Sequence, residues 1–242
     1  MDEVPSLEDI QAVTGWLGRA LEECCRDNQP RAADLSTLSA HQRTLLDQLL
    51  GEGEVTLTCR QEGQRLRFRE TTLPGVWRAH RLDAGGDLHL DRIEVCDAPP
   101  IVRRPPEPAW AARLKPAGAV EGVINALPLL TELAEHLERW KPGKTVHTIN
   151  LTLLPLSPAD LNLLHQTLGS GPVEGRIHGY GDTRINATAC PGIWWVRHTN
   201  AVGKPILDTL EITDLPAVIC AAPEDLEESR RRFMELMEEI AA

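Results

Sequence analysis

The sequence is poor in aromatic residues, which make up 4% of the chain, and it carries a net charge of −11. It contains no run of about 18 consecutive apolar residues, so the sequence predicts no membrane span. Residues 1–6 are acidic and lack an apolar stretch, which is unlike a secretory signal. A chain with 25 Lys and Arg against 36 Asp and Glu is also a poor match for nucleic acid. We therefore expect a cytoplasmic protein with no nucleic-acid partner.

The six cysteines form no CxxC pair, and Cys24 and Cys25 are the only close pair. Structural zinc sites and thioredoxin-type sites need two thiolates two to four residues apart. We therefore predict no metal ligands and no cofactor, and we expect free thiols in a reducing compartment. An iron–sulfur or metal carrier is an alternative, and it would bring four cysteines together in space: Cys59, Cys96, Cys190 and Cys220.

Common catalytic motifs are missing as well. The eight histidines are scattered, and neither His-Glu-x-x-His nor Gly-x-Ser-x-Gly occurs. Two Gly-x-Gly pairs, at 51–53 and 169–171, each follow a predicted helix and precede a strand, which is the reverse of a phosphate-binding loop. We predict no catalytic residue and no enzyme activity. The alternative is a small-molecule enzyme with its site at the junction of two repeats.

The chain repeats itself once. Residues 45–55 align with 163–173 at an offset of 118, and residues 74–99 align with 191–216 at an offset of 117. The second stretch contains ten identities, and a shift of one residue is what a loop insertion produces. A single repeat of this length indicates a duplicated structural unit.

Each copy has the pattern of an α+β unit. Ser39 and Ser157 are the predicted N-caps of helices ending at Leu50 and Leu168, and a glycine follows each helix. Short alternating segments then predict strands, and these are near 55–59, 65–69, 74–77 and 89–95 in the first copy, and near 176–178, 183–188, 193–198 and 206–212 in the second. A further strand is predicted at 145–154. The fold class is thus α+β, with two tandem repeats, each a small, mostly antiparallel sheet with one or two packed helices, related by a pseudo-twofold.

The proline-rich segment 99–116 predicts a semi-rigid linker between an N-terminal repeat, 1–98, and a C-terminal repeat, 117–242. Outside the repeated stretches, helices are predicted near the N-terminus, at 117–140 and from Pro223. The first would begin at Ser6, with Asp9 as its capping-box partner.

Tryptophan is the informative aromatic residue. Trp77 and Trp194 are equivalent in the repeat and are expected in the two cores, whereas Trp195 aligns with Arg78. Because neighbouring strand residues point to opposite faces, Trp195 either faces outward as a partner contact or lies under a helix. We predict a partner-binding surface at Tyr180, Arg184, Trp195 and Arg197.

Charged residues of the strands leave two further interpretations open. Arg65, Arg67 and Arg69 share one face of a strand and could bind anions, although a solvated sheet face explains them too. Asp91 with Glu94, and Asp208 with Glu211, recur in both copies; they could be acid–base carboxylates, although a constraint at strand ends explains them too.

Several motifs of the second copy resemble the HupH/HyaF/HoxQ family of hydrogenase expression/formation proteins. They are residues 168–173, the Gly-Tyr-Gly at 179–181, the Trp-Trp-Val-Arg at 194–197, residues 210–212 and residues 216–225. The resemblance is densest over 145–230 and extends more weakly over 35–103.

The resemblance implies a non-catalytic chaperone or assembly factor in NiFe-hydrogenase maturation. Such a protein would bind an immature hydrogenase subunit before export, with the small iron–sulfur subunit precursor and its twin-arginine leader favoured and the large subunit as an alternative. A thioredoxin-like hydrogenase accessory protein would be a further partner. The acidic balance of the chain is compatible with a basic leader peptide.

Overall fold

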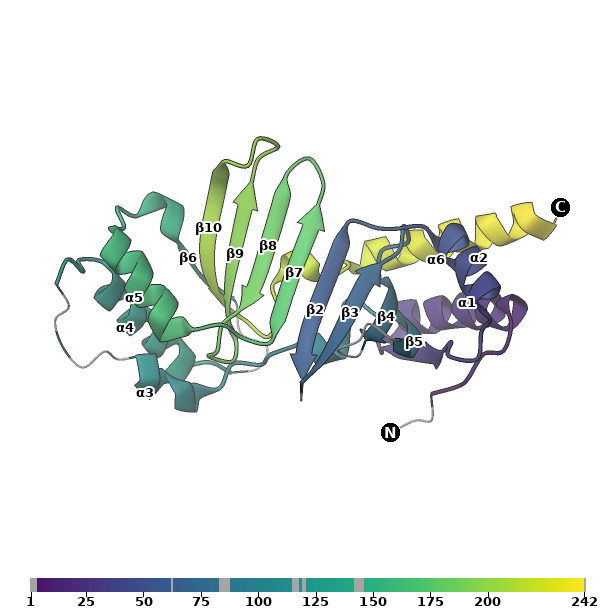
Figure 1. Ribbon diagram of the computed structural model, residues 1–242, viewed down its shortest axis with the longest axis horizontal. Helices are drawn as coiled ribbons and strands as arrows, with labels where there is room; N and C mark the ends of the chain where they lie inside the picture. The colour runs from purple at the N-terminus through teal and green to yellow at the C-terminus, as the bar shows by residue number, and fades with distance from the viewer. Residues whose placement is uncertain are drawn as a thin grey trace. The chain divides into compact units, whose positions relative to one another are not determined.

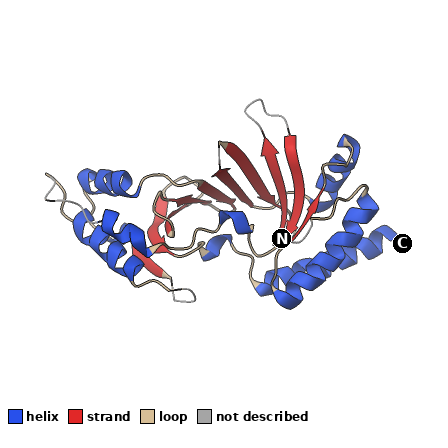
Figure 2. Ribbon diagram, turned by 90° about the horizontal axis from the view of Figure 1, so that it is seen from below, coloured by secondary structure: helices blue, strands red, loops and turns tan. Residues whose placement is uncertain are grey.

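The structure, a computed structural model, describes residues 4–61, 63–82, 88–114, 118, 121–141 and 146–241. It has an α+β fold, with antiparallel strands and six α-helices in the described residues (Figures 1 and 2). Contacts divide the chain into unit 1, Met1–Val102 with Val218–Ala242, and unit 2, Arg103–Ala217. The predicted α+β class is confirmed.

Unit 1 contains a five-stranded antiparallel sheet in the order β1-β5-β4-β3-β2. Its strands are β1 (Arg31–Asp34), β2 (Val55–Gln61), β3 (Gln64–Glu70), β4 (Val76–Leu82) and β5 (Leu88–Val95). Its helices are α1 (Ile10–Asp27), α2 (Ala40–Leu50) and α6 (Pro223–Ala241). In β2 the buried residues are Val55, Leu57 and Cys59, the period of two expected of a strand with one face in the core.

Helices α1 and α6 lie side by side in unit 1 (Figure 1). Leu17 of α1 and both Leu226 and Phe233 of α6 belong to one buried cluster. The Ser229 hydroxyl also donates a hydrogen bond of 2.9 Å to the Pro74 carbonyl. The contacts of α6 are thus with unit 1, whereas the predicted boundary grouped this helix with residues 117–242.

The start of α1 differs from the predicted start. Asp9, rather than Ser6, is the N-cap, and its carboxylate accepts a hydrogen bond of 2.7 Å from the Ala12 N–H. Ser6 lies three residues earlier in an isolated bridge to Asp34. The sequence Ser6-x-x-Asp9 is compatible with a helix capped by Ser6 and with one capped by Asp9. The bridge to Asp34 keeps Ser6 extended, so the helix begins after Asp9.

Unit 2 contains the corresponding strands in the order β6-β10-β9-β8-β7. They are β6 (His147–Asn150), β7 (Val173–His178), β8 (Asp182–Ala187), β9 (Ile193–Thr199) and β10 (Pro205–Ile212). Its helices are α3 (Ala111–Leu114), α4 (Ala126–Glu138) and α5 (Pro158–Leu168). Leu130 and Leu133 of α4 pack with Leu164 of α5 in its core.

Two predicted elements of unit 2 are shorter than expected. Helix α4 begins at Ala126, because the Asp160 carboxylate accepts hydrogen bonds from the N–H groups of Ile124, Asn125 and Ala126. Strand β6 ends at Asn150, whose side chain accepts a bond from the Thr152 N–H and starts a 3₁₀ turn. Side-chain caps of this kind set helix boundaries that apolar periodicity does not reveal.

The predicted linker contains 3₁₀ turns at Pro100–Val102 and Pro108–Trp110, followed by α3. At the start of unit 2, Arg103 forms an ion pair of 2.9 Å with Asp214, and the Arg104 N–H donates to the Asp214 carbonyl. None of the helices in the described part of the chain combines the length and apolar character needed to cross a membrane.

Helix α2 of unit 1 and helix α5 of unit 2 share local details at both of their ends. Ser39 and Ser157 each form a capping box, as predicted. Gly51 and Gly169 follow with φ of 64° and 59°, the backbone region that glycine adopts without a Cβ clash. The predicted caps and helix ends are confirmed.

The equivalent tryptophans are buried in the same way. Trp77 and Trp194 are both 0% exposed. The Trp77 indole N–H donates to the Cys96 carbonyl at 3.2 Å, and that of Trp194 donates to the Thr213 carbonyl at 3.1 Å. The prediction that both lie in a core is confirmed.

Candidate functional site

A hollow of about 240 Å³, which we name the Trp195 pocket, lies in unit 2 where the end of α5 meets one face of β7, β8 and β9. Its lining mixes charged, polar and aromatic side chains. The residues are His165, Gly169, Ser170, Gly171, Glu174, Arg184, Asn186, Ala187, Thr188, Trp195 and Arg197.

Trp195 forms the aromatic wall of this pocket. It is 7% exposed, and its ring stacks on His165 of α5 with 4.2 Å between ring centroids and 7° between planes. Its indole N–H donates a hydrogen bond of 2.5 Å to Oδ1 of Asp208. Of the two orientations left open by the sequence, the structure has Trp195 under a helix, where it contributes one wall rather than a protruding contact.

A row of three arginines crosses the sheet beside Trp195. Arg176 of β7 lies opposite Arg184 of β8, and Arg184 lies opposite Arg197 of β9. We call these three residues the arginine row. Because directly opposed residues share a face of a sheet, their guanidinium groups extend on one side. Carboxylates lie on the same face: Asp208 is opposite Arg197, and Glu174 lines the pocket.

The ends of the arginine row differ in their pairing. Arg197 donates to Oδ2 of Asp208 through Nε at 2.9 Å and through Nη2 at 2.6 Å. Arg176 and Arg184 are exposed, and the described residues include no ion-pair partner for either. Two guanidinium groups are therefore open to an external acid.

Tyr180 lies apart from the pocket lining, in the turn between β7 and β8, and its side chain is 98% exposed. A Cβ on the next residue, Gly181, would lie 2.1 Å from the Thr199 carbonyl oxygen, so this tight turn requires glycine. The structure thus brings together Arg184, Trp195 and Arg197 of the four predicted site residues. It places Tyr180 at the tip of the hairpin.

Sequence reasoning missed His165, Asp208 and Arg176 as parts of this site. Asp208 was visible only as one of a repeated Asp–Glu pair, and nothing in the sequence specifies that its carboxylate contacts Trp195. The contact of His165 with Trp195 depends on how α5 lies over the sheet. Arg176 could have been found by writing the predicted strands side by side.

The same positions of unit 1 carry a closed ion-pair cluster. Arg78 and Asp91 are the repeat equivalents of Trp195 and Asp208, and Arg78 is 2% exposed. Arg78 donates to Asp47 of α2 and, at 2.8 Å, to Asp91. Burial would raise the pKa of the Asp91 carboxyl, but hydrogen bonds and charge from His80 and Arg78 outweigh it and lower that pKa.

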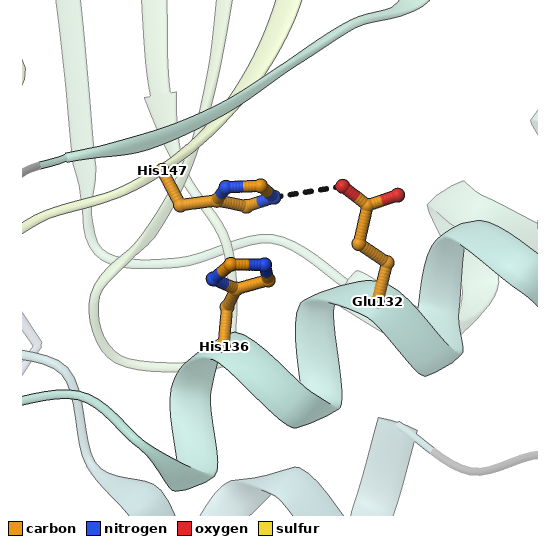
Figure 3. A group of neighbouring side chains, drawn as sticks. All are labelled: Glu132, His136 and His147. Carbon is orange, nitrogen blue, oxygen red and sulfur yellow. Dashed lines mark hydrogen bonds and ion pairs between the residues drawn. The ribbon is translucent and has the colours of Figure 1, made fainter.

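A second group of polar side chains lies elsewhere in unit 2 (Figure 3). Glu132 and His136 are one turn apart on α4, and His147 begins β6. The His136 and His147 rings stack with 3.4 Å between centroids and 6° between planes, and Nε2 of His147 lies 2.8 Å from Oε1 of Glu132. Burial and the neighbouring His147 lower the pKa of His136. One potential ligand atom from each residue lies within 4.8 Å of the other two.

The Glu132 group is the only set of three or more such ligand residues found among the described parts of the chain. The i,i+4 spacing of Glu132 and His136 was a sequence signal, but the approach of His147 depends on the fold. The six cysteines are not joined in disulfides, and within the described residues Cys59, Cys96 and Cys220 of unit 1 do not belong to such a group. Burial raises the pKa of Cys190 to about 12, which disfavours the reactive thiolate.

Comparisons with known proteins give a consistent result. The family described as "HupH hydrogenase expression protein, C-terminal conserved region" matches residues 9–115 and 123–240. Hydrogenase expression/formation protein HoxQ of Cupriavidus necator is 38% identical over 245 residues, covering 100% of this chain and 85% of the relative. HoxQ of Azotobacter vinelandii is 41% identical, covering 97% and 80%. Hydrogenase-1 operon protein HyaF of Escherichia coli is 36% identical, covering 87% and 73%.

Among solved structures, the hydrogenase expression protein HupH from Thiobacillus denitrificans is similar to this chain. It is 36% identical, with a TM-score of 0.45, and the match covers 48% of this chain and 96% of that one.

Proposed function

Because this chain belongs to the HupH family of hydrogenase expression proteins, we propose that it is a non-catalytic accessory protein of NiFe-hydrogenase maturation that binds an immature hydrogenase subunit. Relatives named for hydrogenase expression or formation match nearly the whole chain, which supports this role. We favour the precursor of the small iron–sulfur subunit as the client, bound in the cytoplasm before export, with the large subunit as the alternative.

The arginine row beside the Trp195 pocket is the observation that carries the binding proposal. Guanidinium groups present a planar fork of donors that matches a carboxylate, and two of the three here have no partner ion in the described residues. Arginine and tryptophan are also enriched among residues that dominate protein interfaces. An exposed cationic row next to an aromatic-walled hollow is therefore suited to holding a protein segment.

The charge of this surface indicates which segment it would hold. Arg176 and Arg184 would repel a basic leader peptide. Although the chain as a whole is acidic, this site is therefore not suited to binding the leader. We propose that the site binds an acidic segment of the precursor, with a carboxylate at Arg184 and a flat or apolar side chain beside Trp195. Opposite charges across the interface would also speed association at low salt.

We further propose that the two units are copies of one α+β repeat. The common strand order, the paired capping boxes and the two equivalent indole hydrogen bonds support this interpretation. The pseudo-twofold relation and the thioredoxin-like partner remain predictions.

The test is capture of tagged hydrogenase subunit precursors by three forms of the full chain: wild type, Arg184→Glu and Arg67→Glu. Arg67 is the matched control, because it is the repeat equivalent of Arg184 and is also exposed on a central strand. We expect wild type and Arg67→Glu to retain the unprocessed small subunit. Arg184→Glu should retain at least about tenfold less, since it places a like charge against the acidic segment.

Two outcomes contradict the proposal. If wild type retains neither precursor, the chaperone role is wrong. If both variants lose capture equally while circular dichroism shows that they are folded, the binding surface is not in the arginine row. Retention of the large subunit alone would reverse the preference for the small-subunit client.

A further inference from the structure

We propose that Glu132, His136 and His147 form a binding site for one divalent transition-metal ion with the preferences of Zn²⁺. This group lies on α4 and β6, apart from the residues that line the Trp195 pocket. Nothing in the proposed capture of a hydrogenase subunit requires a metal ion here. The inference therefore stands on the geometry of the three side chains.

The elements that carry the three residues bring their donor atoms together. Glu132 and His136, four residues apart on α4, lie on the same side of the helix. His147 reaches the same place from β6, and one ligand atom of each residue is within 4.8 Å of the other two. In a tetrahedral zinc site with bonds of about 2.0–2.1 Å, ligand atoms lie about 3.4 Å apart. Side-chain rotations that turn one imidazole out of the ring stack and shorten these separations would close the group around an ion.

The two imidazole rings and the Glu132 carboxylate lie in direct contact with one another. In Figure 3 one ring lies above the other, and the Glu132 carboxylate lies beyond the ring edge that carries Nε2 of His147. The stack brings two imidazole rings and one carboxylate into the same small space. Because parallel rings direct their nitrogen lone pairs in parallel planes, one imidazole must turn out of the stack before both can bind the same ion.

The types of donor indicate the class of ion. Imidazole nitrogens suit zinc and its first-row neighbours, whereas magnesium and calcium prefer sites built entirely of oxygen. Two histidines and one carboxylate are also a known ligand set for zinc with an open fourth position. Side chains of His147 and Glu132 are 26% and 44% exposed, so an ion could enter from solvent. The open position would accept water or a donor from another molecule.

The principal alternative is an ordinary hydrogen bond between His147 and Glu132, with His136 stacked beside it. That arrangement requires no ion and predicts only a small contribution to stability. The chain offers a matched control for it. His178 and Asp182 also form an exposed histidine–carboxylate pair with a separation of 2.8 Å, and no group of three ligands includes them.

The experiment uses the purified full chain, treated with a chelator and kept reduced. Isothermal titration with Zn²⁺ is compared for wild type, His136→Ala, Glu132→Gln and the control His178→Ala. Co²⁺ then replaces Zn²⁺ as a spectroscopic probe, because nitrogen and oxygen ligands give no intense thiolate charge-transfer band. This step separates the proposed site from binding by cysteine thiols.

We expect wild type and His178→Ala to bind one Zn²⁺ and to show a cobalt spectrum without a thiolate band. His136→Ala and Glu132→Gln should weaken this site by roughly 100-fold or more, because even loss of an outer hydrogen-bond partner costs about 10–100-fold. Zn²⁺ should raise the melting temperature of wild type but not that of the two ligand variants. Circular dichroism without metal checks that they remain folded.

The proposal is overturned if wild type binds no Zn²⁺, or if both ligand variants bind it as tightly as wild type does. A cobalt spectrum dominated by thiolate bands would likewise assign the binding to cysteines. Failure to capture a hydrogenase subunit would not affect these readouts, so the two proposals can fail independently.

Discussion

Units 1 and 2 have the same strand order, but the residues between α2 and the sheet of unit 1 differ in kind from those between α5 and the sheet of unit 2. In unit 1 Arg78 lies between two carboxylates, and it forms an ion pair with each of them. In unit 2 the equivalent of Arg78 is Trp195, which is stacked on His165 and borders an open hollow. The same backbone plan thus supports a closed ionic cluster in one unit and a pocket in the other.

The difference concerns which side chains at this position could contact another molecule. The guanidinium group of Arg78 is 2% exposed and is paired with carboxylates of its own unit. In unit 2 the aligned buried residue is Trp195, and the arginine row crosses the three strands beside it. Exposed arginines also occur on β3 of unit 1, but those of unit 2 lie next to the Trp195 pocket with its aromatic wall. Under the proposed function, unit 2 is the unit that binds.

The largest expected effect is on the unfolding free energy, when the ion pairs of Arg78 in unit 1 are removed. Arg78→Met would leave Asp91, which is 1% exposed, without its most buried partner. Breaking a buried ion pair on one side costs about 3–5 kcal/mol, so we expect a loss of roughly 3 kcal/mol in unfolding free energy by urea titration. Arg67 is exposed and has no ion-pair partner among the described residues. Arg67→Met should therefore change the unfolding free energy by less than about 0.5 kcal/mol. Equal effects of the two variants would contradict the structural role of the cluster.

A second effect compares the two capping boxes. Asp160 of unit 2 accepts four backbone N–H bonds, from Ile124, Asn125, Ala126 and Ser157, whereas its equivalent Gln42 closes only its own box. Asp160→Ala should cost about 2 kcal/mol, because it removes hydrogen bonds to a charged group. Gln42→Ala should cost about 0.5–1 kcal/mol.

The pH dependence of the Asp160 effect has a defined sign. Burial would raise the pKa of this carboxyl, but the hydrogen bonds from Ala126, Ser157 and Ile124 outweigh it and hold the pKa well below its usual range. The stabilisation is therefore present above pH of about 4 and declines as the pH falls below it. Urea titrations of wild type and Asp160→Ala at several pH values measure this. If the difference in unfolding free energy between wild type and Asp160→Ala grew as the pH fell, the ionised carboxylate would not be the stabilising form.

A smaller effect separates the two functions of Trp195. Trp195→Phe keeps an aromatic ring beside His165 but removes the indole N–H that donates to Asp208. We expect a loss of about 1–2 kcal/mol in unfolding free energy from the bond and the smaller volume. Precursor capture should fall by less than for Arg184→Glu. If capture by Trp195→Phe falls further than that, the aromatic wall rather than the arginine row determines binding.

The smallest effect concerns Glu94, which lies on the face of β5 opposite to Asp91. Burial raises the pKa of Glu94 to about 7, with Arg92 acting in the other direction. A raised pKa means that its contribution to stability is full below about pH 4.5 and is lost as the pH rises through about 7. Glu94→Gln should therefore be more stable than wild type by about 1 kcal/mol at pH 8 and similar to it at pH 5. Thermal melts at the two pH values measure this, and no gain at pH 8 would contradict it.

Much of the fold could be predicted, because the repeat supplied each pattern twice. Ser39 and Ser157 marked the helix starts, and Trp77 and Trp194 marked the core strands. The boundaries that were predicted incorrectly depend on distant contacts. Helix α4 begins where Asp160, over thirty residues away, caps its N–H groups. Helix α6 packs on α1, which no local pattern specifies.

The candidate site was predictable in part for the same reason. Trp195 was predicted from strand alternation and from its departure from the repeat, and Arg184 and Arg197 were predicted only as arginines near it. The stack with His165 and the bond to Asp208 require the observed register and helix position. Likewise, the group at Glu132 joins a helix to an edge strand, and sequence spacing reveals only two of its three members.

The most direct test of the central claim is the dissociation constant of the captured precursor for three forms of the protein. They are wild type, Arg176→Gln with Arg184→Gln in unit 2, and Arg65→Gln with Arg67→Gln in unit 1. The account predicts that the unit 2 pair weakens binding about tenfold or more and that the unit 1 pair changes it less than about twofold. Equal weakening by the two pairs, or a greater loss from the unit 1 pair, would contradict it.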